Sequence, residues 1–286
     1  MTGLRDRLVF GTGRLAGGPY AARSRRMIEA CIEAGIRRFD TAPGYGMGAS
    51  EALLGDVTRG LEGITLHTTV GSHRPTAPAL RGWAKWLRNL APNAAGQVRL
   101  DGAIARFSSV PPGMAFTADE LTRSLARSRK HLHREQLDLV LLHEAEPQLI
   151  SSDSWTMLRA AAARGEIGRL GFAHGGPPQN DDLALTAQTA PMQQDFLRSI
   201  AGQRRIFHSV RRSLRAAMQH DPAVAAIAVQ ICLRYRLRLE IAAHEYLTGL
   251  LLLGQIWPDA ELIFATSRPE NLAEFLSLLQ WVEPAA

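Results

Sequence analysis

The chain has 286 residues, of which 46% are hydrophobic, and a formal net charge of +6. Its arginines are spread through apparent helices and loops, with no basic run or tail, which argues against a nucleic-acid-binding protein. The first residues form no apolar leader, and the longest apolar run, 250–253, is far too short to span a membrane. Cys31 and Cys232 lack the spacing of a metal or redox motif. We therefore expect a cytoplasmic protein without a metal site.

Short β-rich segments alternate with helical patterns along the chain. The expected strands are 8–10, 36–40, 64–70, 137–142, 170–173, 192–194, 206–210 and 262–265. The expected helices are 24–34, 49–57, 117–132, 154–164, 222–236 and 269–279. Regular alternation predicts a parallel sheet. About eight such units in one chain predict an α/β fold of the (β/α)8 TIM-barrel type.

The whole chain, 1–286, is interpreted as one domain. A doubly wound sheet is the rival fold, but Gly11-Thr12-Gly13 lacks the third glycine of the dinucleotide fingerprint. Two segments are longer than the connections that a minimal eight-stranded barrel needs. Residues 72–116 predict a long loop without clear periodicity, and residues 211–259 contain more helix than one repeat needs. Neither stretch has the composition of a linker between domains.

In a barrel of this type, the reactive residues lie at the C-terminal ends of the strands. Asp40 ends the second expected strand, Tyr45 follows on its loop, and His143 ends the fourth. A carboxylate, a phenol and an imidazole at neighbouring strand ends form a plausible group for proton transfer. His208 and Ser209 also form an adjacent pair, but no nucleophile elbow surrounds them, which argues against a hydrolase.

Three segments resemble the aldo-keto reductase family. They are 40–51 followed by Leu54-Gly55, the strand 137–143, and the passage 164–172. The first segment, DTAPGYGMGASE, is long and unusual, and the nearest likeness is to the bacterial sugar or aldose dehydrogenase-like branch. The resemblance runs from about residue 8 to residue 175 and resumes near residue 261.

The resemblance implies an NAD(P)-dependent oxidoreductase that interconverts a small carbonyl compound and its alcohol. Tyr45 would be the proton donor, Asp40 its supporting carboxylate, and His143 the group that orients the carbonyl. NADP is the expected cofactor, with NAD as the alternative. The expected cofactor contacts are Gly11, Thr12, His174, Gln193, Ser209, Arg211, Thr266, Ser267, Arg268 and Glu274. Arg212 and Arg215 are further candidates for the pyrophosphate. The expected partner is a small-molecule substrate, with no nucleic acid and no membrane.

The resemblance also reveals departures. The family's catalytic lysine falls at Thr69, and Ala173 and Ala265 replace polar and basic cofactor contacts. Without the ammonium group, the pKa of Tyr45 should stay near ~10, so that on the order of 0.1% is phenolate at pH 7. The chain has two lysines, Lys85 and Lys130. A replacement cation would have to come from the loop, as His73, Arg74 or Lys85, or from His67.

Two alternatives to the redox enzyme stay open. The barrel could have changed chemistry, to a lyase, isomerase or dehydratase that uses Tyr45 and His143. It could also be a non-catalytic family member that acts as a binding or regulatory protein. Thr69 and Ala173 motivate both alternatives. The Ser50-Glu51 pair is interpreted as a helix cap rather than a catalytic pair.

Overall fold

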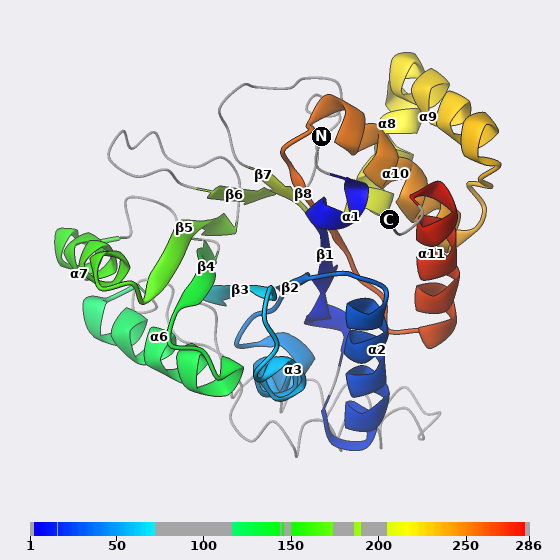
Figure 1. Cartoon of the computed structure of the whole chain (residues 1–286). Coiled ribbons are helices and arrows are strands. Elements are labelled where there is room, and N and C mark those ends of the chain that lie inside the picture. The colour runs from blue at the N-terminus through cyan, green and yellow to red at the C-terminus, as the bar shows by residue number, and fades with distance from the viewer. Residues whose placement is uncertain are drawn as a thin grey trace, which may run out of the picture.

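A computed structural model describes most of the chain (Figure 1). The described residues are 3–15, 17–71, 116–143, 145, 150–173, 186–189 and 205–283. The expected loop over 72–116 and the expected strand 192–194 therefore lie outside the described residues, apart from Phe116. In this part of the chain, no helix is long and apolar enough to span a membrane.

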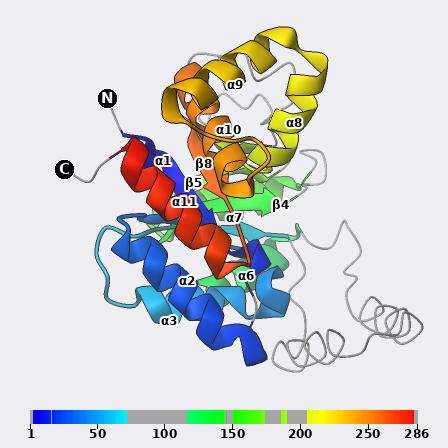
Figure 2. The same cartoon turned by 90° about the vertical axis from the view of Figure 1, so that its right-hand side faces the viewer.

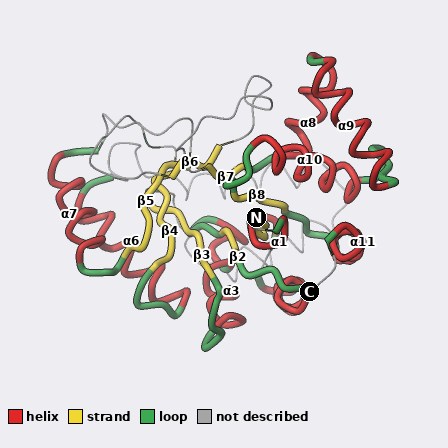
Figure 3. Tube along the Cα trace, turned by 45° about the horizontal axis from the view of Figure 1, so that its top comes forward, coloured by secondary structure: helices red, strands yellow, loops and turns green. Residues whose placement is uncertain are grey.

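Eight strands form one parallel sheet that curls around a central axis (Figure 3). They are β1 Leu8–Gly11, β2 Arg38–Asp40, β3 Thr65–Val70, β4 Leu137–His143, β5 Ile167–Ala173, β6 Thr186–Thr189, β7 Arg205–Phe207 and β8 Glu261–Phe264. Each strand pairs with the next along the chain, and β8 pairs with β1 through Val9 and Ile263. The predicted α/β class and the parallel sheet are confirmed.

Helices lie around the sheet (Figures 1 and 2). They are α1 Leu4–Arg7, α2 Ala21–Glu33, α3 Ser50–Thr58, α6 Ala118–Leu132, α7 Ser152–Ala163, α8 Val210–His220, α9 Pro222–Tyr235, α10 Ala242–Ile256 and α11 Pro269–Val282. Short 3-10 turns are η1 Thr12–Arg14, η2 Gly18–Tyr20 and η3 Tyr45–Gly48. Between β7 and β8 the chain forms α8, α9 and α10, which pack together beside the sheet (Figure 2).

Most expected elements are present, and their ends differ for identifiable reasons. The expected strand 206–210 stops at Phe207, because Ser209 adopts a left-handed φ of 55° and Val210 begins α8. The fifth strand begins at Ile167 rather than residue 170, because Ile167 pairs with Leu137. The N-terminus of α6 is capped as the sequence predicts, since the Thr117 side chain accepts a hydrogen bond from the Glu120 backbone.

The apolar core has two layers. The larger layer lies between the sheet and the helices. The smaller one fills the space inside the curled sheet and consists of Val9, Leu139, Leu141, Ile206 and Ile263. Side chains that alternate along the strands supply the two layers. On β3, for example, Thr68 contacts α3 and α6 through Glu51 and Ser128, whereas its neighbour Thr69 has the opposite orientation.

A glycine sets the distance between α3 and α6. A Cβ atom at Gly55 would lie 2.2 Å from the His131 carbonyl oxygen and 2.7 Å from the Leu132 Cα. Backbone atoms of α6 cannot yield as a flexible side chain would, so this position accepts only glycine at the present spacing. The close approach brings the buried Glu51 of α3 within reach of Ser128 on α6, at 2.8 Å.

A charged cluster lies inside the sheet. His67 on β3 is fully buried, and its Nε2 lies 3.1 Å from Glu261 Oε2 on β8. Arg169 on β5 donates to the other Glu261 oxygen at 3.0 Å. Burial is the main cause that lowers the pKa of His67 to about 4; Glu261 opposes it, and Arg169 and Arg38 add to it. His67 is therefore uncharged at neutral pH.

This cluster predicts acid sensitivity. The unfolded chain takes up a proton at His67 near pH 6.5, whereas the folded protein takes it up near pH 4. The free energy of unfolding should therefore fall as the pH falls through this window, by roughly 3 kcal/mol at most. In denaturant titrations from pH 7 to pH 4, the wild type should lose more stability than His67→Gln. His220→Gln, at the exposed end of α8, is the control and should follow the wild type. Parallel pH profiles for wild type and His67→Gln would contradict the assignment.

Candidate functional site

Asp40 and Tyr45 lie together at the end of β2. Asp40 is the last residue of the strand and is 3% exposed, and Tyr45 begins η3 five residues later. The Tyr45 ring packs against η1, where a Cβ at Gly13 would lie 3.2 Å from Tyr45 Cε2. The absence of a side chain at Gly13 lets the phenol lie against the end of β1.

A chain of buried hydroxyl groups fixes the backbone around Asp40. Thr12 Oγ1 donates to the Asp40 carbonyl oxygen at 3.0 Å, and Ser50 Oγ donates to Thr12 Oγ1 at 2.6 Å. Thr41 Oγ1 donates to Ser50 Oγ at 3.1 Å. The network joins the ends of β1 and β2 to the start of α3, and every member is satisfied, which rigidifies this edge.

The Ser50-Glu51 pair does not cap a helix, so that expectation was wrong. The N-cap of α3 is Ala49, and it makes no side-chain hydrogen bond. Ser50 belongs to the hydroxyl network, and the buried Glu51 accepts from Thr68 at 2.7 Å and Ser128 at 2.8 Å. Hydrogen bonds from two elements offset the desolvation of this carboxylate, which gives Glu51 a role in joining α3, β3 and α6.

The Asp40 carboxylate raises the pKa of the Tyr45 phenol above its ordinary value, and burial raises it further. The prediction that this pKa stays near its ordinary value was wrong, because it did not include the neighbouring carboxylate. Thr69, where the sequence predicts the replacement of the family's lysine, is 2% exposed on β3. His67, a suggested substitute, instead faces Glu261 inside the sheet.

His143 and Ala173 end the neighbouring strands β4 and β5 and pair in register. Because all strands are parallel, Asp40, Thr69 and His143 lie at the same edge of the sheet. His143 is half-buried there. Within the described residues, no group of three or more metal-binding side chains gathers at this edge or elsewhere.

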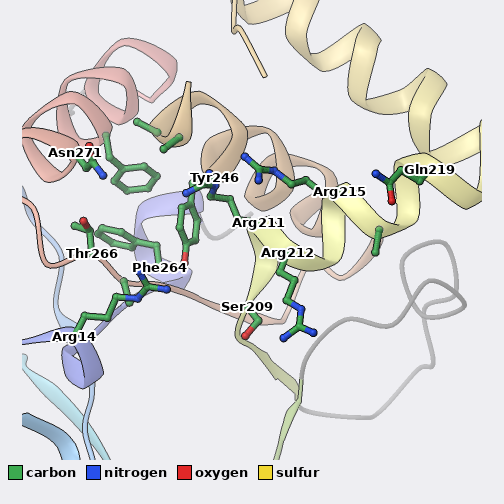
Figure 4. A pocket seen from close by; sticks show the side chains of 15 residues that line it. Arg14, Ser209, Arg211, Arg212, Arg215, Gln219, Tyr246, Phe264, Thr266 and Asn271 are labelled. Atoms are coloured by element: carbon green, nitrogen blue, oxygen red, sulfur yellow. The ribbon is translucent and has the colours of Figure 1, made fainter. Parts of the chain in front are cut away.

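A cavity of about 580 Å³ opens beside β8, between α8, α10 and α11 (Figure 4). Among the described residues, four arginines contribute to its wall and no acidic residue lines it. The lining residues are Arg14, Ser209, Arg211, Arg212, Arg215, Ala216, Gln219, Ala242, Ala243, Tyr246, Phe264, Ala265, Thr266, Asn271 and Phe275. Its charge predicts an anionic ligand.

One wall of the cavity is aromatic. Phe264 and Phe275 stack with centroids 4.1 Å apart and an interplanar angle of 28°. Tyr246 meets both rings edge-on at 6.5 Å. Burial raises the pKa of Tyr246, so its phenol is neutral at neutral pH. The aromatic wall offers an apolar surface to the uncharged part of a ligand.

Two helices begin at the cavity. Ser209 precedes α8 and Arg268 precedes α11, and neither makes a side-chain hydrogen bond to the first turn of its helix. Thr266 Oγ1 accepts from the Arg268 backbone at 3.1 Å and shapes the turn before α11. Uncapped N–H groups at a helix N-terminus bind phosphate well, and arginine side chains add charge-assisted bonds. The geometry therefore suits a phosphorylated ligand.

The structure places the expected cofactor residues in three groups. Ser209, Arg211 and Thr266 line the cavity, and so do the further candidates Arg212 and Arg215. Gly11 and Thr12 lie at the end of β1, near Tyr45. Ser267, Arg268 and Glu274 are not part of the lining: the Ser267 carbonyl accepts from Arg23, and Glu274 Oε1 lies 3.7 Å from His244 Nε2. His174 and Gln193 lie outside the described residues.

Several lining residues were not predicted from the sequence, notably Arg14, Tyr246 and Asn271. Arg14 comes three residues after β1, so a search of all strand ends for basic side chains would have found it. Tyr246 lies within α10, and Asn271 lies in the first turn of α11. No pattern in the sequence marks Tyr246 as a lining residue, because its place depends on how α10 packs.

Solved structures of aldo-keto reductases share this fold. A thermostable aldo-keto reductase in complex with the inhibitor epalrestat is 16% identical, with a TM-score of 0.63 over 96% of this chain and 89% of that one. An aldo-keto reductase from Bacillus halodurans, in its holo form, is 15% identical, with a TM-score of 0.62 over 98% and 87%. An aldo/keto reductase from Klebsiella pneumoniae in complex with NADP and acetate is 14% identical, with a TM-score of 0.59 over 96% and 85%.

Sequence comparison gives the family. A pyridoxal 4-dehydrogenase from Microbacterium luteolum is 33% identical over 142 residues, which are 48% of this chain and 39% of that protein. The chain thus matches well under half of the length of this relative. The model of the Aldo/keto reductase family matches residues 7–194, which include Asp40, Tyr45, Thr69 and His143. The chain therefore belongs to the aldo/keto reductase family, a family of oxidoreductases.

Proposed function

We propose that the protein is an NAD(P)-dependent oxidoreductase that interconverts a small carbonyl compound and its alcohol, with Tyr45 as the proton donor. The observation that carries the proposal is the Asp40–Tyr45 pair at the same end of the sheet as a cavity rich in arginine. Family membership supports the reaction type. The dehydrogenase activity of the Microbacterium luteolum relative is consistent with it.

The cavity fits the phosphorylated part of a dinucleotide. The N-terminal turns of α8 and α11 would bind phosphate oxygens through backbone N–H groups, and Arg14 and Arg212 would add charge. We infer NADP as the cofactor, as in the Klebsiella pneumoniae structure, with NAD as the alternative. When bound, the cofactor supplies or accepts the hydride.

In this proposal Tyr45 protonates the oxygen that becomes negatively charged when the carbonyl is reduced. Because the pKa of Tyr45 is raised, the phenol carries its proton at neutral pH. An alkoxide is a stronger base than a phenolate, so donation from Tyr45 is downhill. Oxidation of an alcohol needs the phenolate, which is scarce. We therefore expect reduction to be faster than oxidation at neutral pH.

Asp40 and His143 take supporting roles in the proposal. The hydroxyl network holds the Asp40 backbone, and the carboxylate keeps the neighbouring phenol protonated. His143, at the end of β4, would donate a hydrogen bond to the carbonyl oxygen of the substrate. We also infer that 1–286 is one (β/α)8 domain, supported by the β1–β8 pairing and by fold likeness over 96% of the chain.

The first test is binding of the nucleotide. Titration with NADPH and NADH should quench or shift nucleotide fluorescence and raise the melting temperature, because a ligand that binds the folded state stabilises it. At a hundredfold excess over the dissociation constant, the gain is about 2.7 kcal/mol. No response to either nucleotide at millimolar concentration would contradict the redox proposal. It would favour a non-redox enzyme or a non-catalytic family member.

The second test removes the phenol hydroxyl. Tyr45→Phe keeps the ring that packs on Gly13, so the fold and nucleotide binding should persist. Carbonyl reduction should fall by about 10²–10⁴, the usual effect of losing a general acid. Tyr235→Phe, on α9 and away from the site, is the matched control. Unchanged reduction in Tyr45→Phe would show that Tyr45 is not the proton donor.

The third test restores a cation at residue 69. In this proposal, Thr69→Lys would bring an ammonium group to Tyr45, which should lower the pKa of that phenol and speed alcohol oxidation at neutral pH. Thr69→Met has similar length without charge and controls for the added volume at this buried position. Alkaline titration of tyrosinate absorbance, with the Tyr45→Phe signal subtracted, measures the pKa. Equal pKa values in the two variants would argue against Thr69 as the position of the lost lysine.

A further inference from the structure

A buried carboxylate holds two of the four cavity arginines. Glu245, in the first turn of α10, has a side chain that is 3% exposed. It accepts from Arg211 Nε at 2.5 Å and from Arg215 Nη2 at 2.8 Å, and Arg215 Nε also donates to it. The Arg215 contact is bidentate, the strongest arrangement between these two groups.

The spacing along α8 separates the arginines into two sets. Arg211 and Arg215 are four residues apart and lie on one face of the helix, so both reach Glu245. Arg212 is rotated about 100° from Arg211 and extends past Ser209, away from Arg215 (Figure 4). Within the described part of the chain, neither Arg212 nor Arg14 forms a hydrogen bond or an ion pair.

An anion in the cavity therefore meets two kinds of arginine. Drawing Arg211 and Arg215 away from Glu245 would leave a buried carboxylate without partners, which is strongly unfavourable. Arg14 and Arg212 line the cavity, and no carboxylate of the described residues binds them in competition with a ligand.

We propose that Glu245 is a specificity-determining residue of this cavity: it withholds Arg211 and Arg215, so that Arg14 and Arg212 are the side chains that bind the anionic group. This proposal rests on the proposed function in taking the cavity as the phosphate site of the cofactor. Glu245 thereby limits the number of phosphate charges that the cavity neutralises. Replacing Glu245 should release both arginines and strengthen the binding of anions.

The test compares two arginines on one helix. Inorganic pyrophosphate is titrated calorimetrically at constant ionic strength, because binding to exposed arginines depends on salt. Arg212→Gln should weaken binding about tenfold or more, the usual effect of losing a hydrogen bond between charged groups. Arg215→Gln, a matched change at an exposed side chain of the same cavity, should weaken it less than about threefold. Equal losses in the two variants would overturn the proposal.

Glu245→Gln, alone and combined with Arg215→Gln, completes a double-mutant cycle. It retains the shape of the side chain and removes its charge, and binding of pyrophosphate should become about tenfold tighter. In the Glu245→Gln background, Arg215→Gln should weaken binding about tenfold, as Arg212→Gln does in the wild type. Thermal unfolding shows whether each variant is folded. If Glu245→Gln does not fold, the comparison of Arg212→Gln with Arg215→Gln decides the matter alone.

The two proposals fail in different ways. If pyrophosphate binds with the expected ranking but NADPH does not bind, the proposed function fails and the role of Glu245 stands. If NADPH binds and Arg215→Gln weakens pyrophosphate binding as much as Arg212→Gln, the role of Glu245 fails and the proposed function stands. If pyrophosphate does not bind to the wild type at all, the cavity is not an anion site and the role of Glu245 is refuted.

Discussion

Parallel pairing of the strands in chain order is the constraint on which the rest of this structure depends. Hydrogen bonds between neighbours, including β8 with β1, bring the C-terminal ends of all the strands to one edge. Asp40 and His143 are far apart in sequence, yet they reach that edge because each ends a strand. The arginine cavity arises in the same way, since α8 follows β7 and α11 follows β8 at this edge. The sheet thus places Asp40, Tyr45 and the arginine-rich cavity on one side of the molecule.

Two kinds of polar interaction stabilise that arrangement, a network of neutral hydroxyl groups and a set of ion pairs. Around Asp40 the polar atoms belong to neutral hydroxyl groups that satisfy one another, so the backbone is fixed without any buried cation in the network. Around Glu245 and Glu261, by contrast, arginines offset buried carboxylates. The hydroxyl network adds no cation near Tyr45, and the charge of Asp40 raises the pKa of its phenol. The ion pairs fix side chains whose positions determine the charge of the cavity and of the sheet interior.

Much of the fold could be predicted from the sequence, because burial on both faces makes parallel strands such as β4, with its run 139–142, read as mainly apolar. The Thr117 cap and the helices predicted over 222–236 and 269–279 were likewise visible in local patterns, and the structure has them at Pro222–Tyr235 and Pro269–Val282. The motif around Tyr45 could be found because its residues are adjacent in the chain. The Glu245 contacts could not be found, since they depend on the packing of α10 against α8. The raised pKa of Tyr45 also escaped prediction, because it reflects burial and the distance to Asp40 rather than residue type.

The charged cluster inside the sheet carries a consequence for the evolution of this protein. Arg38, His67, Arg169 and Glu261 come from four different strands and interact electrostatically around the fully buried His67. His67 is uncharged at neutral pH, but replacing Arg169 or Glu261 alone leaves its partner with an uncompensated charge, so drift through one substitution at a time at these two positions is opposed by selection for stability. Lineages can pass from this set to an apolar interior only through coordinated changes. Among relatives, positions 169 and 261 should therefore co-vary, and the pair should be inherited or lost together.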